Sequence, residues 1–187
     1  MENFYKLAPY IAWMAILMAG LPYWVRTVCG GILLLPWIWE KARGGREKGG
    51  GCGATILPSA VAGLAVFAVW IFPEVSGLVS PAAKSAPPHP WIQLFGSAFV
   101  IAAAEELFFR DWLYGWLLKN WSKASAFALC VLLFAVEHDK FICGAIAGIV
   151  YLLLYLRRGL VAAVIAHATT NLALGIYVIL TGSWYFW

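Results

Sequence analysis

Long apolar runs, separated by short polar connections, constrain this chain more than any other feature of its sequence. The clearest are Ala54–Phe72, Ala124–Val136, Phe141–Leu156 and Leu160–Leu180. Only 12% of the 187 residues are charged, against about 25% in soluble domains, so the chain has too few charges for a water-soluble surface. We therefore predict an all-α fold, a polytopic membrane bundle of about six to seven transmembrane helices.

The remaining runs complete this organisation. Pro9–Trp24 and Val28–Trp39 form two short spans or one re-entrant hairpin, and Trp91–Leu118 is a long helical run interrupted only by EELFFRD. Glu40–Gly53 is glycine-rich and basic, which is typical of a flexible loop outside the bilayer. The chain is thus predicted to be a single membrane domain, 1–187, whose part 91–180 carries the polar motifs described below.

Lysine and arginine placement predicts how the bundle is oriented, because cytoplasmic loops carry an excess of both. With a cytoplasmic amino terminus and two spanning first runs, the inner side holds Lys6, Lys41, Arg43, Arg46, Lys48, Lys119, Lys123, Arg157 and Arg158. The outer side holds Arg26, Lys84 and Lys140. We therefore expect the Glu40–Gly53 loop to be cytoplasmic.

The same charges argue against a nucleic-acid partner, since they lie in the gaps between apolar runs and form no patch with interleaved aromatics. The four cysteines show no CxxC pair or metal-type spacing. No cleavable signal peptide is evident, because the first apolar run leads into a second one. Without a eukaryotic retention signal, we expect an integral protein of a prokaryotic inner membrane, with the lipid bilayer as its surroundings.

Charged and polar residues inside the apolar runs are the unusual feature. They concentrate in EELFFRD on the long run, EHD at the end of the next, and HATTN on the last. A charged side chain at mid-bilayer costs on the order of 2.5–3.5 kcal/mol. Residues so placed must pair with one another or line a wet cavity, which predicts a site shared by three helices.

Helical spacing predicts how the first cluster is arranged. Glu106 and Arg110 are four residues apart, so they lie on one face and can pair. Glu105 is rotated by about 100° from Glu106 and points towards a neighbouring helix or cavity. A carboxylate without a cation partner in such a cavity is a plausible general base.

The other two clusters supply polar groups for the same pocket. Phe134 and His138 share a helix face, as do His167 and Asn171. If the three helices pack together, Glu105 meets these imidazoles and the amide, which can orient a water molecule and stabilise an oxyanion. This equipment suits acyl hydrolysis without a serine or cysteine nucleophile.

Structural roles for the same residues remain alternatives at this point. Glu106 and Arg110 form a purely structural ion pair in one interpretation, and Asn171 makes an interhelical hydrogen bond in another. His138 then marks only a helix end near the interface. The joint occurrence on three separate runs favours function.

Three motifs in this order resemble a known family. They are E-E-x-x-x-R (Glu105, Glu106, Arg110), F-x-x-x-H (Phe134, His138) and H-x-x-x-N (His167, Asn171). The pattern resembles the CAAX-protease and bacteriocin-processing family, also called Abi, whose members are intramembrane proteases. The resemblance covers about Trp91 to Leu180.

The resemblance implies a role for each residue. Glu105 would activate water with the help of His138, His167 and Asn171 would support the oxyanion, and Glu106, Arg110 and Phe134 would hold the site's shape. We expect no cofactor, because no H-E-x-x-H pattern preorganises a metal. Zinc stays an alternative, with Glu105, His138 and His167 as its ligands.

The resemblance also implies a substrate: a membrane-anchored or lipidated protein or peptide, cut near its carboxy terminus. The predicted orientation puts Glu105 near mid-membrane and His138 towards the outer end of its helix, so we expect the site to be reached from the outer half of the bilayer. Two rivals remain. One is a scaffold or immunity protein of the same family that binds peptide without cutting it. The other is an ion- or proton-conducting protein, since buried Glu and His also serve as proton relays.

Overall fold

The computed structural model describes residues 52–78 and 90–183 together with positions 25, 29 and 32. Every element in these residues is a helix, with no strand among them. Four helices are long and apolar enough to cross a membrane, and a fifth is shorter but also apolar. This confirms the predicted all-α membrane bundle. The run Pro9–Trp24, the run Val28–Trp39 apart from positions 29 and 32, and the Glu40–Gly53 loop up to position 51 lie outside the described residues.

Helix α3, Cys52–Val75, packs along α9, Leu160–Thr181. The two helices approach closely at Gly63, where a Cβ atom would lie only 2.3 Å from the carbonyl oxygen of Ala166. Small residues permit this kind of helix contact in membranes. The contact places α3 directly behind the polar residues of α9.

The predicted long run is one continuous span, Pro90–Asn120. It consists of α4 (Pro90–Phe95), η2 (Gly96–Ile101), α5 (Ala102–Glu106), η3 (Leu107–Leu113) and α6 (Tyr114–Asn120), of which η2 and η3 are π-helical. π-helical turns inside α-helices occur frequently at functional sites. The short α5, which carries both glutamates, therefore lies between two widened segments.

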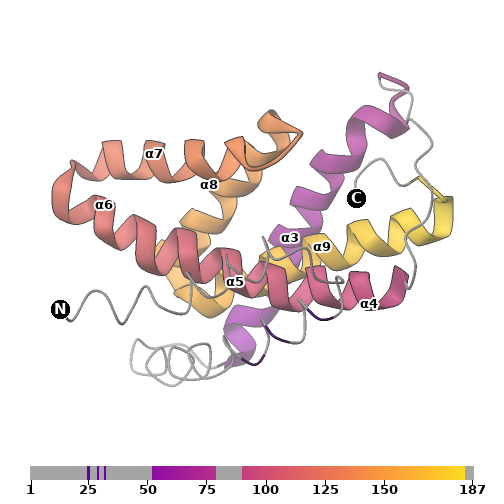
Figure 1. Cartoon of the computed structure of the whole chain (residues 1–187), viewed down its shortest axis with the longest axis horizontal. Helices are drawn as coiled ribbons and strands as arrows, with labels where there is room; N and C mark the ends of the chain where they lie inside the picture. Colours follow the sequence, from indigo (N-terminus) through magenta and orange to yellow (C-terminus); the bar gives the residue numbers. More distant parts are fainter. Residues whose placement is uncertain (1–24, 26–28, 30–31, 33–51, 79–89, 184–187) are drawn as a thin grey trace.

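A helical hairpin follows the long span (Figure 1). Helix α7, Lys123–Val136, is preceded by its N-cap Ser122, whose hydroxyl accepts a hydrogen bond from the Ser125 N–H at 3.1 Å. Helix α8, Phe141–Arg158, returns along α7. Gly159 separates α8 from α9 with a φ of +86°, a conformation that favours glycine.

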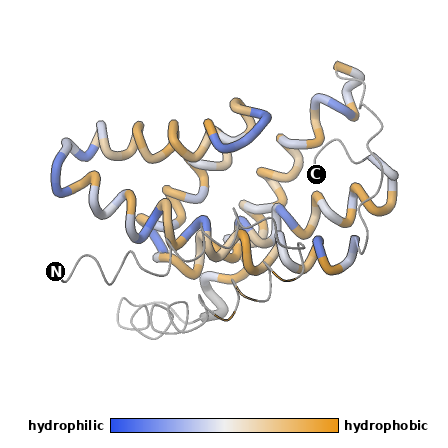
Figure 2. Tube along the Cα trace, in the orientation of Figure 1, coloured by the Kyte–Doolittle hydropathy of each residue, from blue (hydrophilic) through white to orange (hydrophobic). Residues whose placement is uncertain are grey.

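Helix lengths bring the ends of this arrangement to the same level. Glu105 precedes Asn120 by about 22 Å of helix, and α7 rises about 20 Å from Lys123 to Val136, at about 1.5 Å per residue. Because α6 and η3 pack against α7, the turn after α7 lies beside Glu105. Figure 2 shows hydrophilic residues at this turn and at the α6–α7 turn, with apolar helices between them.

Candidate active site

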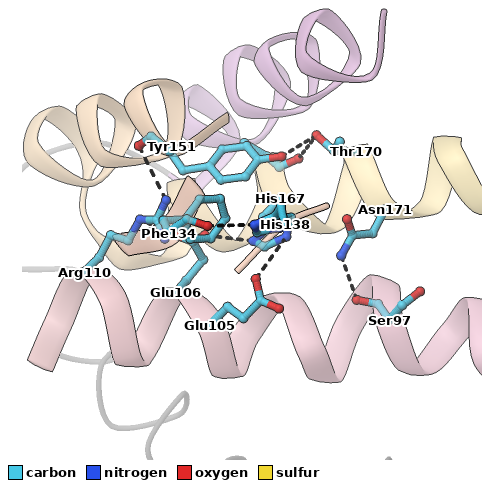
Figure 3. A network of polar contacts seen from close by, with 12 residues as sticks. Ser97, Glu105, Glu106, Arg110, Phe134, His138, Tyr151, His167, Thr170 and Asn171 are labelled. Carbon is cyan, nitrogen blue, oxygen red and sulfur yellow. Dashed lines mark hydrogen bonds and ion pairs between the residues drawn. The ribbon is translucent and has the colours of Figure 1, made fainter. Parts of the chain in front are cut away.

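Glu106, on α5, lies at the centre of a buried polar network (Figure 3). Its Oε1 accepts a hydrogen bond from Nδ1 of His167 at 2.8 Å. Its Oε2 lies 3.0 Å from Nε of Arg110, an ion pair between side chains that are 0% and 1% exposed. The predicted Glu106–Arg110 pair is therefore present. The contact with His167 was not predicted, because helical spacing describes neighbours only within one helix.

Arg110 is enclosed by aromatic rings as well as by its carboxylate. The guanidinium carbon lies 4.2 Å from the centroid of the Phe134 ring, within the range of a cation–π contact. Its Nη2 donates to the carbonyl oxygen of Gly148 at 3.5 Å. The arginine thus fixes Glu106 on one side while Phe134 shields the pair from water.

Glu105 has different surroundings from its neighbour. Its Oε2 lies 3.8 Å from Nε2 of His167, too far for a hydrogen bond, and its side chain is 26% exposed. Oε2 has no hydrogen-bond partner in the part of the chain that the structure describes. The two adjacent carboxylates are therefore divided: Glu106 is committed to structural contacts, and Glu105 keeps an oxygen available for chemistry.

Both histidines are oriented through Nδ1. The Nδ1 of His138 lies 2.7 Å from the carbonyl oxygen of Phe134, and the Nδ1 of His167 lies 2.8 Å from Glu106. Because a carbonyl and a carboxylate accept hydrogen bonds, each Nδ1 carries the proton in a neutral ring. Each Nε2 is then left as an acceptor for a further ligand or water.

A cavity of about 120 Å³ adjoins these groups. It is lined by Trp70, Phe134, His138, Ala147, Tyr151, His167, Thr170, Asn171 and Leu174. The volume can hold several water molecules. Three of the four predicted catalytic residues, His138, His167 and Asn171, thus surround one space. Glu105 does not line this cavity and lies beside it, next to His167.

Asn171 also joins two elements of the bundle. Its Nδ2 donates to the carbonyl oxygen of Ser97 at 3.0 Å, in the π-helical segment η2. This is the kind of interhelical hydrogen bond that the structural interpretation of Asn171 expects. The amide retains a second N–H and its oxygen, so the contact leaves room for a catalytic role.

The turn after α7 adds a further carboxylate near the site. Burial of the Glu137 carboxyl group, followed by the charge of Glu105, raises its pKa to about 7. The residue as a whole is exposed, as expected for a helix-end residue. Glu137 therefore brings a titrating charge close to Glu105.

Tyr151 and Thr170 belong to the site but were missed by the sequence analysis. Tyr151 stacks on His167 with ring centroids 4.7 Å apart, and its hydroxyl donates to Thr170 at 2.7 Å. A tyrosine in an apolar run is ordinary in a membrane helix, so nothing in the sequence marked it. The only signal in the sequence was weak: Tyr151 follows the small residues Ala147 and Gly148 by four and three positions, so it shares their face of α8.

The alternative zinc ligands named above, Glu105, His138 and His167, do not form a cluster in this structure. Within residues 52–78 and 90–183, no three His, Cys, Asp or Glu side chains lie close enough together to hold a metal ion. Glu105 approaches His167, while His138 is turned towards the cavity. The donor set in this arrangement does not fit a zinc site, so we derive no step through a metal.

A family model described as type II CAAX prenyl endopeptidase Rce1-like matches residues 87–173. The match spans all three motifs and the elements from α4 to the middle of α9. This part of the chain is similar to the CAAX-protease family. No curated protein and no solved structure matches the chain. The family is one of intramembrane proteases with membrane-anchored substrates, which agrees with the four membrane-length helices. Helix α3 lies before the matched CAAX-protease segment in the chain. It nevertheless packs against α9, which belongs in part to that segment.

Proposed function

We propose that this chain is an intramembrane endopeptidase that uses Glu105 to activate water and cleaves membrane-anchored or lipidated proteins near their carboxy termini. The observation that carries the proposal is the unequal environment of the two glutamates. Glu106 contacts both Arg110 and His167, whereas Oε2 of Glu105 has no hydrogen-bond partner among the described residues. Paired carboxylates with different surroundings are typical of acid–base catalysis.

The proposed reaction follows from these positions. Glu105 removes a proton from a water molecule, with His138 accepting a hydrogen bond from the same water through Nε2. The resulting hydroxide attacks the scissile carbonyl carbon, and the second N–H of Asn171 donates to the oxyanion that forms. The acceptor Nε2 of His167 lies 3.8 Å from Oε2 of Glu105, so it can accept a hydrogen bond from the Glu105 carboxyl group while that group holds the proton. When the tetrahedral intermediate collapses, the proton held by Glu105 passes to the leaving amine.

The depth of the site supports a membrane-anchored substrate. Glu105 lies at the middle of the span Pro90–Asn120, so a soluble peptide would not reach it easily. The polar turn Glu137–Lys140 lies on the side that the lysine and arginine pattern predicts to be outside. We propose access from the outer half of the bilayer, in a prokaryotic inner membrane. The test is thiol labelling of Asp139→Cys in cells, with the native cysteines replaced. Access from the outside would be overturned if the cysteine reacted only with a reagent that had entered the cytoplasm and not with one added outside.

The decisive experiment compares purified wild-type protein with Glu105→Gln on a panel of membrane-anchored and lipidated peptides. Gln keeps the size of the side chain but cannot act as a base, so we expect cleavage to fall at least about 100-fold. The matched control is Glu74→Gln on α3, a carboxylate that accepts a hydrogen bond from Tyr177 at 3.0 Å and does not line the cavity. The control should cleave at the wild-type rate.

Adding a zinc chelator separates the mechanisms. Cleavage that survives chelation and is lost in Glu105→Gln supports a glutamate-dependent enzyme. Loss on chelation with recovery on adding zinc would contradict the metal-free proposal and favour Glu105, His138 and His167 as ligands. Peptide binding with no cleavage by the wild type would instead favour the non-catalytic scaffold.

A further inference from the structure

The His167 ring is held by a flat contact as well as by its hydrogen bond. Tyr151, on α8, stacks on it with an interplanar angle of 19°, and Phe134 meets its edge with centroids 5.9 Å apart. Nδ1 points to Glu106 at 2.8 Å. One hydrogen bond leaves an imidazole able to swing about that bond, and the stacked ring removes this freedom. The direction of Nε2 therefore depends on where Tyr151 lies.

Tyr151 is itself fixed by a chain of hydroxyl groups. Its hydroxyl donates to Oγ1 of Thr170 at 2.7 Å. Thr170 in turn reaches the carbonyl oxygens of Gly63 at 2.9 Å and Ala166 at 3.1 Å. The Thr170 hydroxyl accepts a hydrogen bond from Tyr151 and has one proton of its own, which it donates to the backbone. Tyr151 and Thr170 are at most 2% exposed, so water does not compete for these bonds.

The Gly63 carbonyl can take part only because α3 lies against α9. A Cβ at position 63 would also lie 2.8 Å from Cβ of Thr169, in addition to its clash with Ala166. Any larger residue would separate the helices and withdraw the carbonyl from Thr170. The polar chain therefore runs from α3 through α9 to α8 and ends on the His167 ring. Figure 3 shows its part from Thr170 through Tyr151 to His167.

We propose that Tyr151 is a positioning residue for His167, and that α3 keeps it in place through Thr170 and the carbonyl oxygen of Gly63. Helix α3 thereby becomes part of the active-site scaffold, although it lies outside the segment that matches the CAAX-protease family. The effect on catalysis rests on the proposed function. The effect on His167 itself does not, and it can be measured without a substrate.

Three substitutions interrupt the chain at different points. Tyr151→Phe keeps the stacked ring and removes its anchor, Thr170→Val keeps the shape of Thr170 and removes its hydroxyl, and Tyr151→Leu removes the ring. Thr170→Ser is the matched conservative variant, because it restores the hydroxyl. Each protein is first compared with wild type by thermal unfolding in detergent, and Thr170→Ser shows whether any loss in Thr170→Val belongs to the hydroxyl.

The kinetic prediction is a fall in kcat with an almost unchanged KM. Misdirecting His167 affects the transition state, and it leaves the apolar contacts of the substrate intact. We expect Tyr151→Phe and Thr170→Val to lower kcat roughly 10-fold, Tyr151→Leu to lower it more, and Thr170→Ser to stay within about twofold of wild type. A loss of packing alone would raise KM or lower the amount of folded enzyme.

Nitrogen NMR of the imidazole rings provides the second measurement. The chain has only three histidines, so protein labelled with ¹⁵N-histidine gives few signals, and His167→Gln assigns the one of interest. In wild type His167 should show one tautomer, with the proton on Nδ1. In Thr170→Val and Tyr151→Leu this signal should broaden or shift towards a mixture, while Thr170→Ser should match wild type.

The two measurements separate this inference from the proposed function. If the wild-type protein cleaves nothing but the variants alter the His167 signals, the positioning role is supported and the protease proposal is not. Unchanged His167 signals in well-folded Tyr151→Leu and Thr170→Val would overturn the positioning role, whatever the activity. If the wild type is active, equal kcat in Tyr151→Phe, Thr170→Val and wild type would overturn it as well.

Discussion

At position 106 a carboxylate contacts both an arginine and a histidine, while at position 105 its neighbour approaches the same histidine only at longer range. The 100° step between successive helical residues produces this difference. One glutamate points into the packed centre of the bundle, and the next points to its edge. Both residues are glutamates, so their different roles follow from their positions on the helix and not from their side-chain chemistry.

Breaking the Glu106–Arg110 pair should destabilise the protein strongly. Arg110→Met leaves the buried Glu106 charge without its arginine, and breaking a buried pair typically costs about 3–5 kcal/mol. We expect a clear fall in the unfolding temperature in detergent. The double variant Glu106→Gln with Arg110→Met is the control, because it removes both charges. It should be more stable than Arg110→Met alone, and the reverse order would contradict the assignment.

Glu137 should make stability depend on pH. Its pKa is raised from the ordinary value of 4.5 to about 7, so the folded protein holds this proton more tightly than the unfolded chain. The folded state therefore loses stability as pH rises from about 4.5 to 7, and the loss is complete above pH 7. Glu137→Gln removes this effect.

The measurement compares thermal unfolding of Glu137→Gln and wild type in detergent. Glu137→Gln should gain stability relative to wild type at pH 8 and show little difference at pH 4.5. Because the residue is largely exposed, we expect a small gain. Asp139→Asn is the control from the same turn. An equal difference at both pH values would show that Glu137 does not titrate as described.

Within a helix, spacing was sufficient to predict contacts, and between helices it was not. The Glu106–Arg110 pair followed from the i, i+4 rule. The contacts of Glu106 with His167 and of Asn171 with Ser97 join residues far apart in the chain, so they depend on helix packing. His167 and Asn171 could be recognised as candidates because polar residues are rare in membrane spans. Tyr151 could not, because tyrosine is common there.

At the scale of elements, the apolar runs located the helices closely. Predicted runs such as Ala124–Val136 and Leu160–Leu180 differ from helices α7 and α9 by one residue at an end. The π-helical segments η2 and η3 were not predicted, because they change hydrogen-bond register without changing the apolar pattern. The element that sequence analysis left without a role was α3, whose contact with α9 depends on Gly63.

Gly63→Ala should test how tightly α3 is packed. In an open helix this change stabilises by about 0.5–1 kcal/mol. Here the new methyl group would meet the Ala166 carbonyl at 2.3 Å, and overpacking typically costs about 1–3 kcal/mol. We expect a lower unfolding temperature. Gly115→Ala on α6 is the matched control, since its Cβ meets nothing within 4 Å. Equal effects of the two changes would contradict the close packing.

For the whole molecule, one arrangement accounts for both the fold and the placement of the site. Helix α9 packs against α3, α8 and the α4–η3 part of the long span, and its polar residues form hydrogen bonds with α3, η2, α5 and α8. Apolar side chains such as Leu57, Ile142 and Leu180 are exposed on the outside of the bundle, where lipid would cover them. The protein is therefore polar inside and apolar outside around α5.

The shortness of α7 has a consequence for the surrounding lipid. Its 14 residues extend about 21 Å, whereas the hydrocarbon layer of a typical bilayer is about 30 Å thick. Lipids next to α7 must therefore compress, or the charged turn after it would lie in hydrocarbon. Vesicles of shorter-chain phospholipids should give faster cleavage than longer-chain ones, and rates independent of chain length would contradict this. The protein would then carry its own thin patch of membrane, and water would approach the scissile bond through it.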